Sequence, residues 1–160
     1  MIPEELLEMG LTYRVLEGFD PQQLRKLVPI AEHKQYRTGE IIFSIGGRSS
    51  YFHLIVSGDV ALEQVARGEP LRVQTLHRGD AMGWSALTDD ARAHFQARAL
   101  SPVTTVAFPS HALREACEND TGLGYVLMKR LVEVIGERLD ATRARVAAQD
   151  PWDGVALRSI

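Results

Sequence analysis

The spacing of apolar and polar positions changes along the chain, and the N-terminal part has helical spacing. Asp20 and Pro21 suit an N-cap and a first helical position, and apolar residues follow at helical intervals to about residue 28. This pattern predicts a short amphipathic helix. An earlier short helix is predicted over residues 4–9, with Gly10 as the residue that ends it.

Short apolar runs separated by glycine-bearing turns occupy residues 33 to 109. Closely spaced runs that are rich in β-branched and aromatic residues predict an antiparallel sandwich or barrel. Residues 79–90 are too polar and too glycine-rich for a strand, so they predict a turn, a single helical turn and a loop. The predicted strands are Ile41–Phe43, Tyr51–Val56, Val60–Val65, Leu71–Leu76, Phe95–Leu100 and Val103–Phe108.

Helical spacing returns after Pro109. Ser110 is predicted to cap a short helix to about residue 117, and a long helix is predicted over about residues 121–148. Apolar residues follow the long helix in steps of three and four, the spacing of a helix-packing seam. The Arg-rich turns from Arg138 to Arg145 lie beside this line and are expected to face solvent. The line consists of Met128, Leu131, Ile135, Leu139, Thr142 and Val146.

Composition fits a globular chain. The 160 residues are 45 % hydrophobic, and no apolar run is long enough to cross a membrane. The acidic start lacks the features of a secretory signal, and a single cysteine, Cys117, excludes an intrachain disulfide, so we expect a cytoplasmic protein. We predict one domain over residues 1–148, with the barrel at about 33–109, the C-terminal helices at about 110–148 and a tail at 149–160.

Net charge narrows the range of partners. The formal charge is −3, whereas domains that hold nucleic acid by its phosphates usually have a basic surface. We therefore expect no direct nucleic-acid binding. A local pocket for a small anion remains open, because one or two arginines do not set the net charge.

The order of the elements, with its series of glycines, resembles the cyclic nucleotide-binding domain, of the type found in the catabolite activator protein and in regulatory subunits of cAMP-dependent kinase. The resemblance spans about residues 19–148. It implies a mainly β fold, a double-stranded β-helix or jelly-roll barrel, with N-terminal helices and a long C-terminal helix. It is carried by Gly39–Phe43, Gly46, Tyr51–Val60, Gly79–Asp80, Gly83, Ala86–Leu87 and Arg98–Leu100.

The resemblance places the family's phosphate-binding cassette on residues 83–94. In the family a Glu of the cassette accepts a hydrogen bond from the ribose hydroxyl, and an Arg forms an ion pair with the cyclic phosphate. Here the Glu position holds Trp84 and the Arg position falls on Ala93, while Arg92 is one residue out of register and His94 takes a neighbouring Ser/Thr position. Losing both anchors weakens nucleotide binding by on the order of a thousandfold.

Two interpretations of the cassette stay open. In the first, Ser85, the amides from Gly83 to Ala86, which open a short helix, and one nearby basic residue (Arg92, His94 or Arg98) hold an anionic or nucleotide-like ligand. In the second, the indole of Trp84 fills a degenerate pocket and the charged groups face water. The candidate ligand-binding residues are Gly83, Trp84, Ser85, Ala86, Arg92, Ala93 and His94.

The sequence gives less support to a metal site or to a catalytic nucleophile than to a ligand-binding cassette. A cupin-like metalloenzyme, the third alternative, needs His-x-His, a carboxylate and a later His around one metal, but the five histidines occur singly. Ser85 lacks the second glycine of a nucleophile elbow, and Cys117 is expected to be a small packed residue. We assign no catalytic residue, no metal and no cofactor; cyclic nucleotide remains open as a ligand.

These patterns together predict a non-enzymatic sensor or regulatory domain. A small ligand at the cassette is expected to bias the long helix, which then contacts a second copy of the chain or a separate effector protein. No membrane partner is expected, and no helix-turn-helix pattern follows the long helix. The alternative from another class is a ligand-free interaction or scaffold domain.

Overall fold

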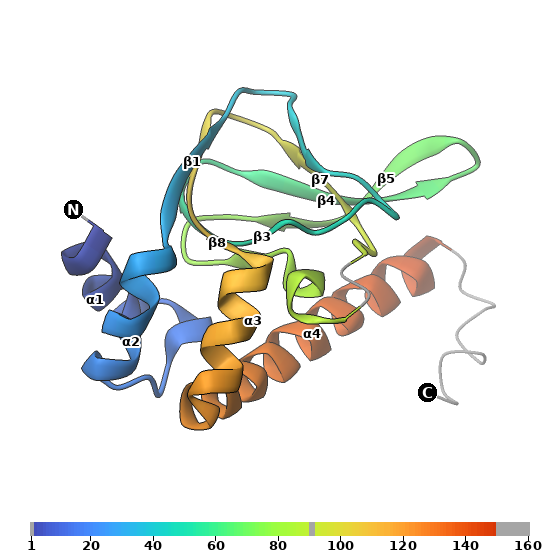
Figure 1. Cartoon of the computed structure of the whole chain (residues 1–160). Coiled ribbons are helices and arrows are strands. Elements are labelled where there is room, and N and C mark those ends of the chain that lie inside the picture. Colours follow the sequence, from blue (N-terminus) through green and yellow to red (C-terminus); the bar gives the residue numbers. More distant parts are fainter. Residues whose placement is uncertain (1, 90–91, 150–160) are drawn as a thin grey trace.

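The computed structural model describes residues 2–89 and 92–149, and in it two four-stranded antiparallel sheets form a flattened barrel (Figure 1). The strand orders are β1-β8-β3-β6 and β2-β7-β4-β5. This confirms the mainly β jelly-roll with flanking helices. The strands are β1 (Glu32–Tyr36), β2 (Ile41–Phe43), β3 (Tyr51–Ser57), β4 (Val60–Ala66), β5 (Glu69–Leu76), β6 (Ala81–Met82), β7 (Gln96–Ala99) and β8 (Val103–Pro109).

Strand β3 explains how the barrel and the helices share one sheet. Ile55 points into the barrel interior with Val60 and Met82, whereas Leu54 packs on the opposite face against the helices. Both side chains, Leu54 and Ile55, are fully buried. A strand covered on both faces needs a nearly continuous apolar run rather than alternation, and residues 52–56 provide one in which only the buried His53 is polar.

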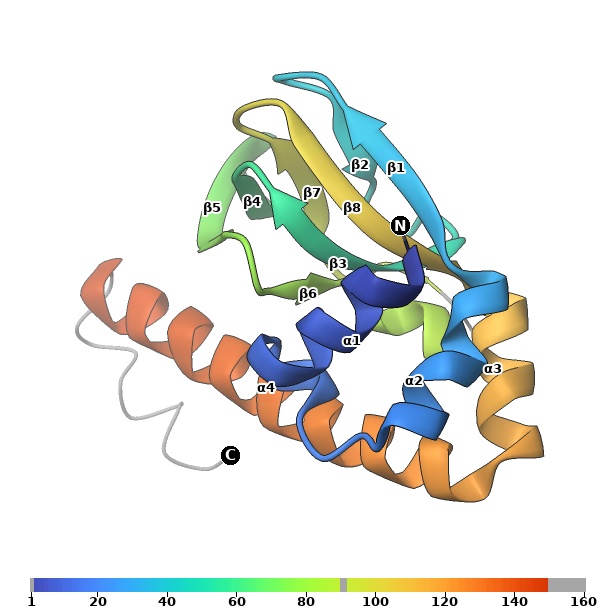
Figure 2. The same ribbon diagram turned by 90° about the vertical axis from the view of Figure 1, so that its left-hand side faces the viewer.

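The helices gather below one sheet. Figure 2 shows α1, α2 and α3 at one end, while α4 passes beneath the barrel and its last turns reach beyond it. The helices are α1 (Ile2–Thr12), α2 (Pro21–Leu27), α3 (Ser110–Asn119) and α4 (Thr121–Gln149), with 3-10 turns η1 (Arg14–Leu16), η2 (Val28–Ile30) and η3 (Trp84–Leu87). No helix in the described ranges is long and apolar enough to cross a membrane.

Two predicted helix ends differ from the structure. Helix α1 continues through Gly10 to Thr12. A Cβ on Gly10 would lie 2.5 Å from Leu24 Cδ1, so this glycine permits close packing of α1 on α2 rather than ending a helix. Ser110 does not cap α3: Pro109 holds that position, and no side chain caps the helix. The predicted cap of α2 is confirmed, since the Asp20 carboxylate accepts a 2.8 Å hydrogen bond from the Gln23 amide.

Two strands were not predicted as strands. β1, with the polar sequence Glu-His-Lys-Gln-Tyr, pairs along its whole length with β8. β6 lies in the segment assigned to turn and loop, but its two residues pair with His53 and Leu54 of β3. Backbone pairing supplied by distant residues forms both strands, without a local apolar pattern. The predicted tail lies outside the described residues, apart from Gln149, which ends α4.

Candidate functional site

The cassette begins at a glycine that no other residue can replace without strain. Gly83 has a φ of +83°, and a Cβ there would lie 2.6 Å from the carbonyl oxygen of Tyr51. The left-handed conformation turns the chain from β6 into η3, which confirms the predicted single helical turn. Ser85 and Ala86 within this turn are buried, so the turn is built into the body of the protein.

Trp84 and His94 close the space beside this turn. Their rings stack in parallel, with centroids 5.1 Å apart. The cavity under them has a volume of about 10 Å³. A water molecule needs roughly 10–15 Å³ by the same kind of measure, so this cavity holds about one water with the rings in place. Its lining consists of Phe43, Leu62, Gly83, Trp84, Ser85, His94, Phe95 and Arg138.

The other predicted site residues lie away from this cavity. Ala86 is fully buried and packs in the core between β3 and the helices. Ala93 is buried, and its backbone exchanges hydrogen bonds with Gly46 and Gly47. Arg92 is exposed and forms an isolated bridge with Arg48. The structure therefore brings together Gly83, Trp84, Ser85 and His94, but not Arg92 or Ala93.

Arg98 has a partner within its own sheet. Its Nε donates a 3.1 Å hydrogen bond to Oε1 of Glu63, and the same oxygen accepts a 3.0 Å bond from Gln96. Glu63 is buried on β4, so Arg98 neutralises a buried carboxylate. Because the Arg98 side chain is paired with Glu63 in the barrel wall, Arg98 is no longer a candidate ligand contact.

The basic residue that does reach the cassette comes from α4. Arg138 was expected to face solvent, but it is only 7 % exposed. Its Nη2 donates to the carbonyl oxygen of Ala81, and this is the one hydrogen bond of the guanidinium among the described residues. Burial lowers the pKa of Arg138 to about 10, partly offset by the charge of Asp80, so the guanidinium stays charged at neutral pH.

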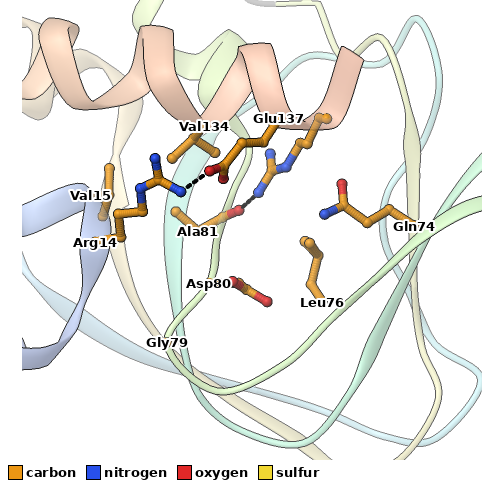
Figure 3. Close-up of a pocket in the computed structure, with 10 residues that line it drawn as sticks. Arg14, Val15, Gln74, Leu76, Gly79, Asp80, Ala81, Val134 and Glu137 are labelled. Atoms are coloured by element: carbon orange, nitrogen blue, oxygen red, sulfur yellow. Dashed lines mark hydrogen bonds and ion pairs between the residues drawn. The ribbon is translucent and has the colours of Figure 1, made fainter. Parts of the chain in front are cut away.

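Arg138 also lines a second cavity, between α4 and β5 (Figure 3). Its volume is about 50 Å³. Two carboxylates line it: Glu137, which pairs with Arg14, and Asp80, which accepts a 2.8 Å hydrogen bond from the amide of His77. The side-chain oxygen of Gln74 is buried at this cavity without a hydrogen-bond partner in the described structure.

Helix α4 has two separate faces. Leu123, Leu127 and Leu131 are buried against the rest of the protein. A neighbouring face follows alternating steps of three and four and is largely exposed, although Ile135 and Thr142 are half-buried and Ile135 packs against the helical core. The predicted apolar line therefore mixes both faces. We call the exposed face the α4 seam; it consists of Tyr125, Met128, Val132, Ile135, Leu139, Thr142 and Val146.

The remaining reactive groups do not form a site within the described ranges. No three His, Cys, Asp or Glu side chains gather there as metal ligands. Cys117 packs half-buried against the helical core, and its burial raises the pKa of the thiol to about 11, so it is not a reactive thiolate.

Comparison with known proteins agrees with this architecture. Residues 33–120, more than half of the chain, match the family model of the cyclic nucleotide-binding domain. A protein from Geobacter metallireducens GS-15 of known structure is 29 % identical, with a TM-score of 0.74 over 87 % of this chain and 98 % of that one. A cyclic nucleotide-binding domain from Methylobacillus flagellatus is 18 % identical, with a TM-score of 0.77 over 92 % of this chain and 83 % of that one.

A curated relative extends the likeness to signalling proteins. The cAMP-dependent protein kinase regulatory subunit of Mycosarcoma maydis is 32 % identical over 77 residues, which is 48 % of this chain and 15 % of that protein. This chain thus spans a small part of that relative. The family match, the jelly-roll topology and the helical turn after Gly83 agree with one another: the chain belongs to the cyclic nucleotide-binding domain family.

Proposed function

We propose that the chain is a non-enzymatic sensor or regulatory domain that takes a small anionic or nucleotide-like ligand at the cassette and signals through α4. The observation that carries this proposal is the contact between α4 and the cassette. Arg138 of α4 lines the same cavity as Ser85 and Trp84 of η3. A ligand seated there touches the long helix directly, so its binding energy can bias the position of that helix. A cytoplasmic location, expected from the sequence, is part of the same proposal.

Thermal unfolding of the full chain with cAMP and with cGMP tests the ligand. A nucleotide at a hundred times its Kd stabilises a protein by about 2.7 kcal/mol, which a melting curve resolves easily. Saturable stabilisation by either nucleotide supports the proposal. The absence of any shift at millimolar nucleotide contradicts a cyclic nucleotide as the ligand.

A ligand-free interaction domain is the second candidate, and the stacked rings favour it. With Trp84 on His94 the cavity holds about one water, so no nucleotide fits without movement of the stack. Trp84→Ala separates the two candidates. If the indole merely covers a working pocket, this variant shows a larger nucleotide-dependent stabilisation than the wild type. If the pocket is degenerate, neither protein responds.

We further propose that the α4 seam pairs with a second copy of the chain. A run of mainly apolar residues in alternating steps of three and four is the pattern of two-stranded helix packing, and most of this run is left exposed here. The seam places Val132, which is 69 % exposed, at the middle of the run. The same helix would then carry the ligand contact on one face and the partner contact on another.

A further inference from the structure

Arg138 is a buried cation with no paired carboxylate among the described residues. It donates a single hydrogen bond, to the carbonyl oxygen of Ala81, although a guanidinium has five N–H donors. A buried charge without a counter-ion is costly, and replacing such groups by apolar side chains is often neutral or stabilising. The charge of Asp80 offsets the burial of Arg138 only in part, and an anion bound beside the guanidinium would compensate more of it.

The two cavities beside Arg138 differ in charge. The one between α4 and β5 already contains the carboxylates of Asp80 and Glu137. The cassette cavity has no carboxylate in its lining, and Arg138 is the only Arg or Lys there. On the β5 side Arg14 and Arg138 balance these two carboxylates, so an added anion gains little there, whereas on the cassette side it meets the charge of Arg138 without a carboxylate.

The cassette cavity also has a hydroxyl available to a ligand. Ser85 is 3 % exposed, and no hydrogen bond of its Oγ is found in the described part of the chain. Of the two rings that cover the cavity, His94 is exposed, whereas Trp84 is half-buried and packs against the helical core. Displacing the stack toward solvent opens the cavity at the cost of that Trp84 contact, and the barrel interior stays packed.

We infer that Arg138 and Ser85 bind the anionic group, a phosphate or a carboxylate, of a small ligand under the Trp84–His94 stack. This inference rests on the proposed function and names its chemistry. The cationic anchor comes from α4, whereas the family resemblance places it within the cassette, at Ala93. The guanidinium exchanges or shares its bond to Ala81 when the anion arrives, so the anion binds α4 itself.

The experiment measures thermal stabilisation of the full chain by inorganic phosphate, acetate, cAMP and cGMP, each against chloride at equal ionic strength. The proteins are the wild type, Arg138→Met and a control, Arg25→Met, which removes one exposed positive charge from α2 by the same chemical change. Arg138→Lys is included because it keeps the buried charge. The phosphate and nucleotide arms distinguish a free anion from a nucleotide phosphate.

We expect the wild type and Arg25→Met to be stabilised by at least one of these anions, with equal apparent Kd. In Arg138→Met that Kd rises on the order of tenfold to a hundredfold, the loss expected for one charge-assisted contact. Arg138→Lys retains part of the effect. Without ligand, Arg138→Met melts at or above the wild-type temperature, because it removes an unpaired buried charge.

Three results overturn the inference, and they are distinguishable. If Arg138→Met binds the active anion as tightly as the wild type, the proposed function stands but the anchor is wrong. If the wild type responds to none of the four compounds, both the inference and the proposed ligand fail. An Arg138→Met protein that melts well below the wild type, with Arg138→Lys restoring stability but no anion response, shows a purely structural role.

Discussion

The α4 seam gives the sharpest prediction, because a single charge placed on it should separate two copies of the chain. Val132 lies on the seam with 69 % of its surface exposed, so Val132→Glu disturbs little of the folded monomer. Burying a whole valine side chain contributes roughly 2 kcal/mol. Two exposed copies meeting across the seam therefore contribute about 3 kcal/mol, and their loss raises the dimer Kd about a hundredfold.

Light scattering coupled to size exclusion, followed by sedimentation equilibrium over a range of concentrations, measures this directly. We expect the wild type to have twice the chain mass of 17.8 kDa and Val132→Glu to have the mass of one chain. Ala144→Glu is the matched control, since it adds the same charge at an exposed position of α4 outside the seam. A wild type that stays monomeric at high concentration, or a Val132→Glu dimer as tight as the wild type, refutes the argument.

Three further substitutions test the packing around the site by urea unfolding. Gly83→Ala should lose about 1–3 kcal/mol more than Gly68→Ala, because both have positive φ but only Gly83 lacks room for a Cβ; equal losses would contradict this. Burial lowers the pKa of His53 to about 4, so the unfolded chain binds that proton first, and wild-type stability should fall by up to about 3 kcal/mol as the pH drops from about 6.5 to 4. That component of the pH dependence should be missing from His53→Gln. Tyr13→Phe should cost about 1 kcal/mol, because the buried hydroxyl donates a 2.5 Å hydrogen bond to the carbonyl oxygen of Ile55, and an unchanged stability would show that Ile55 needs no such donor.

The sequence predicted correctly those elements that depend on interactions between residues close together in the chain. Asp20 and Pro21 define the start of α2, and the structure has the capping box that this pair suggests. The helical turn after Gly83 is likewise set by one residue that tolerates positive φ. The local pattern is insufficient where contacts with distant residues determine the structure. β1 has a polar sequence but forms a strand because it pairs with β8. Gly10 was predicted to end a helix, but it lies within α1, where the missing side chain lets α1 pack closely on α2.

The composition of the site was only partly readable from the sequence. Trp84 and Ser85 could be placed by their position after Gly83, but the contact of Trp84 with His94 depends on how the loop between η3 and β7 returns. Arg138 was missed for a different reason. It follows Leu127 and Leu131 at helical spacing, so its place on the buried face of α4 could have been predicted. Its charge instead favoured the interpretation that it faces solvent.

The two proposals for α4 depend on each other through helix geometry. Arg138 faces the barrel, whereas its neighbour Leu139 lies on the exposed seam. Consecutive residues of a helix differ by about 100° in direction, and the backbone between them is too rigid to move one side without the other. An anion that moves the α4 backbone at Arg138, and not the side chain alone, therefore shifts the seam as well. By linkage, any factor by which the ligand changes the dimer Kd is the factor by which dimerisation changes ligand affinity. Measuring the dimer Kd with and without the bound anion tests that equality, and two independent equilibria would show that α4 does not couple the two sites.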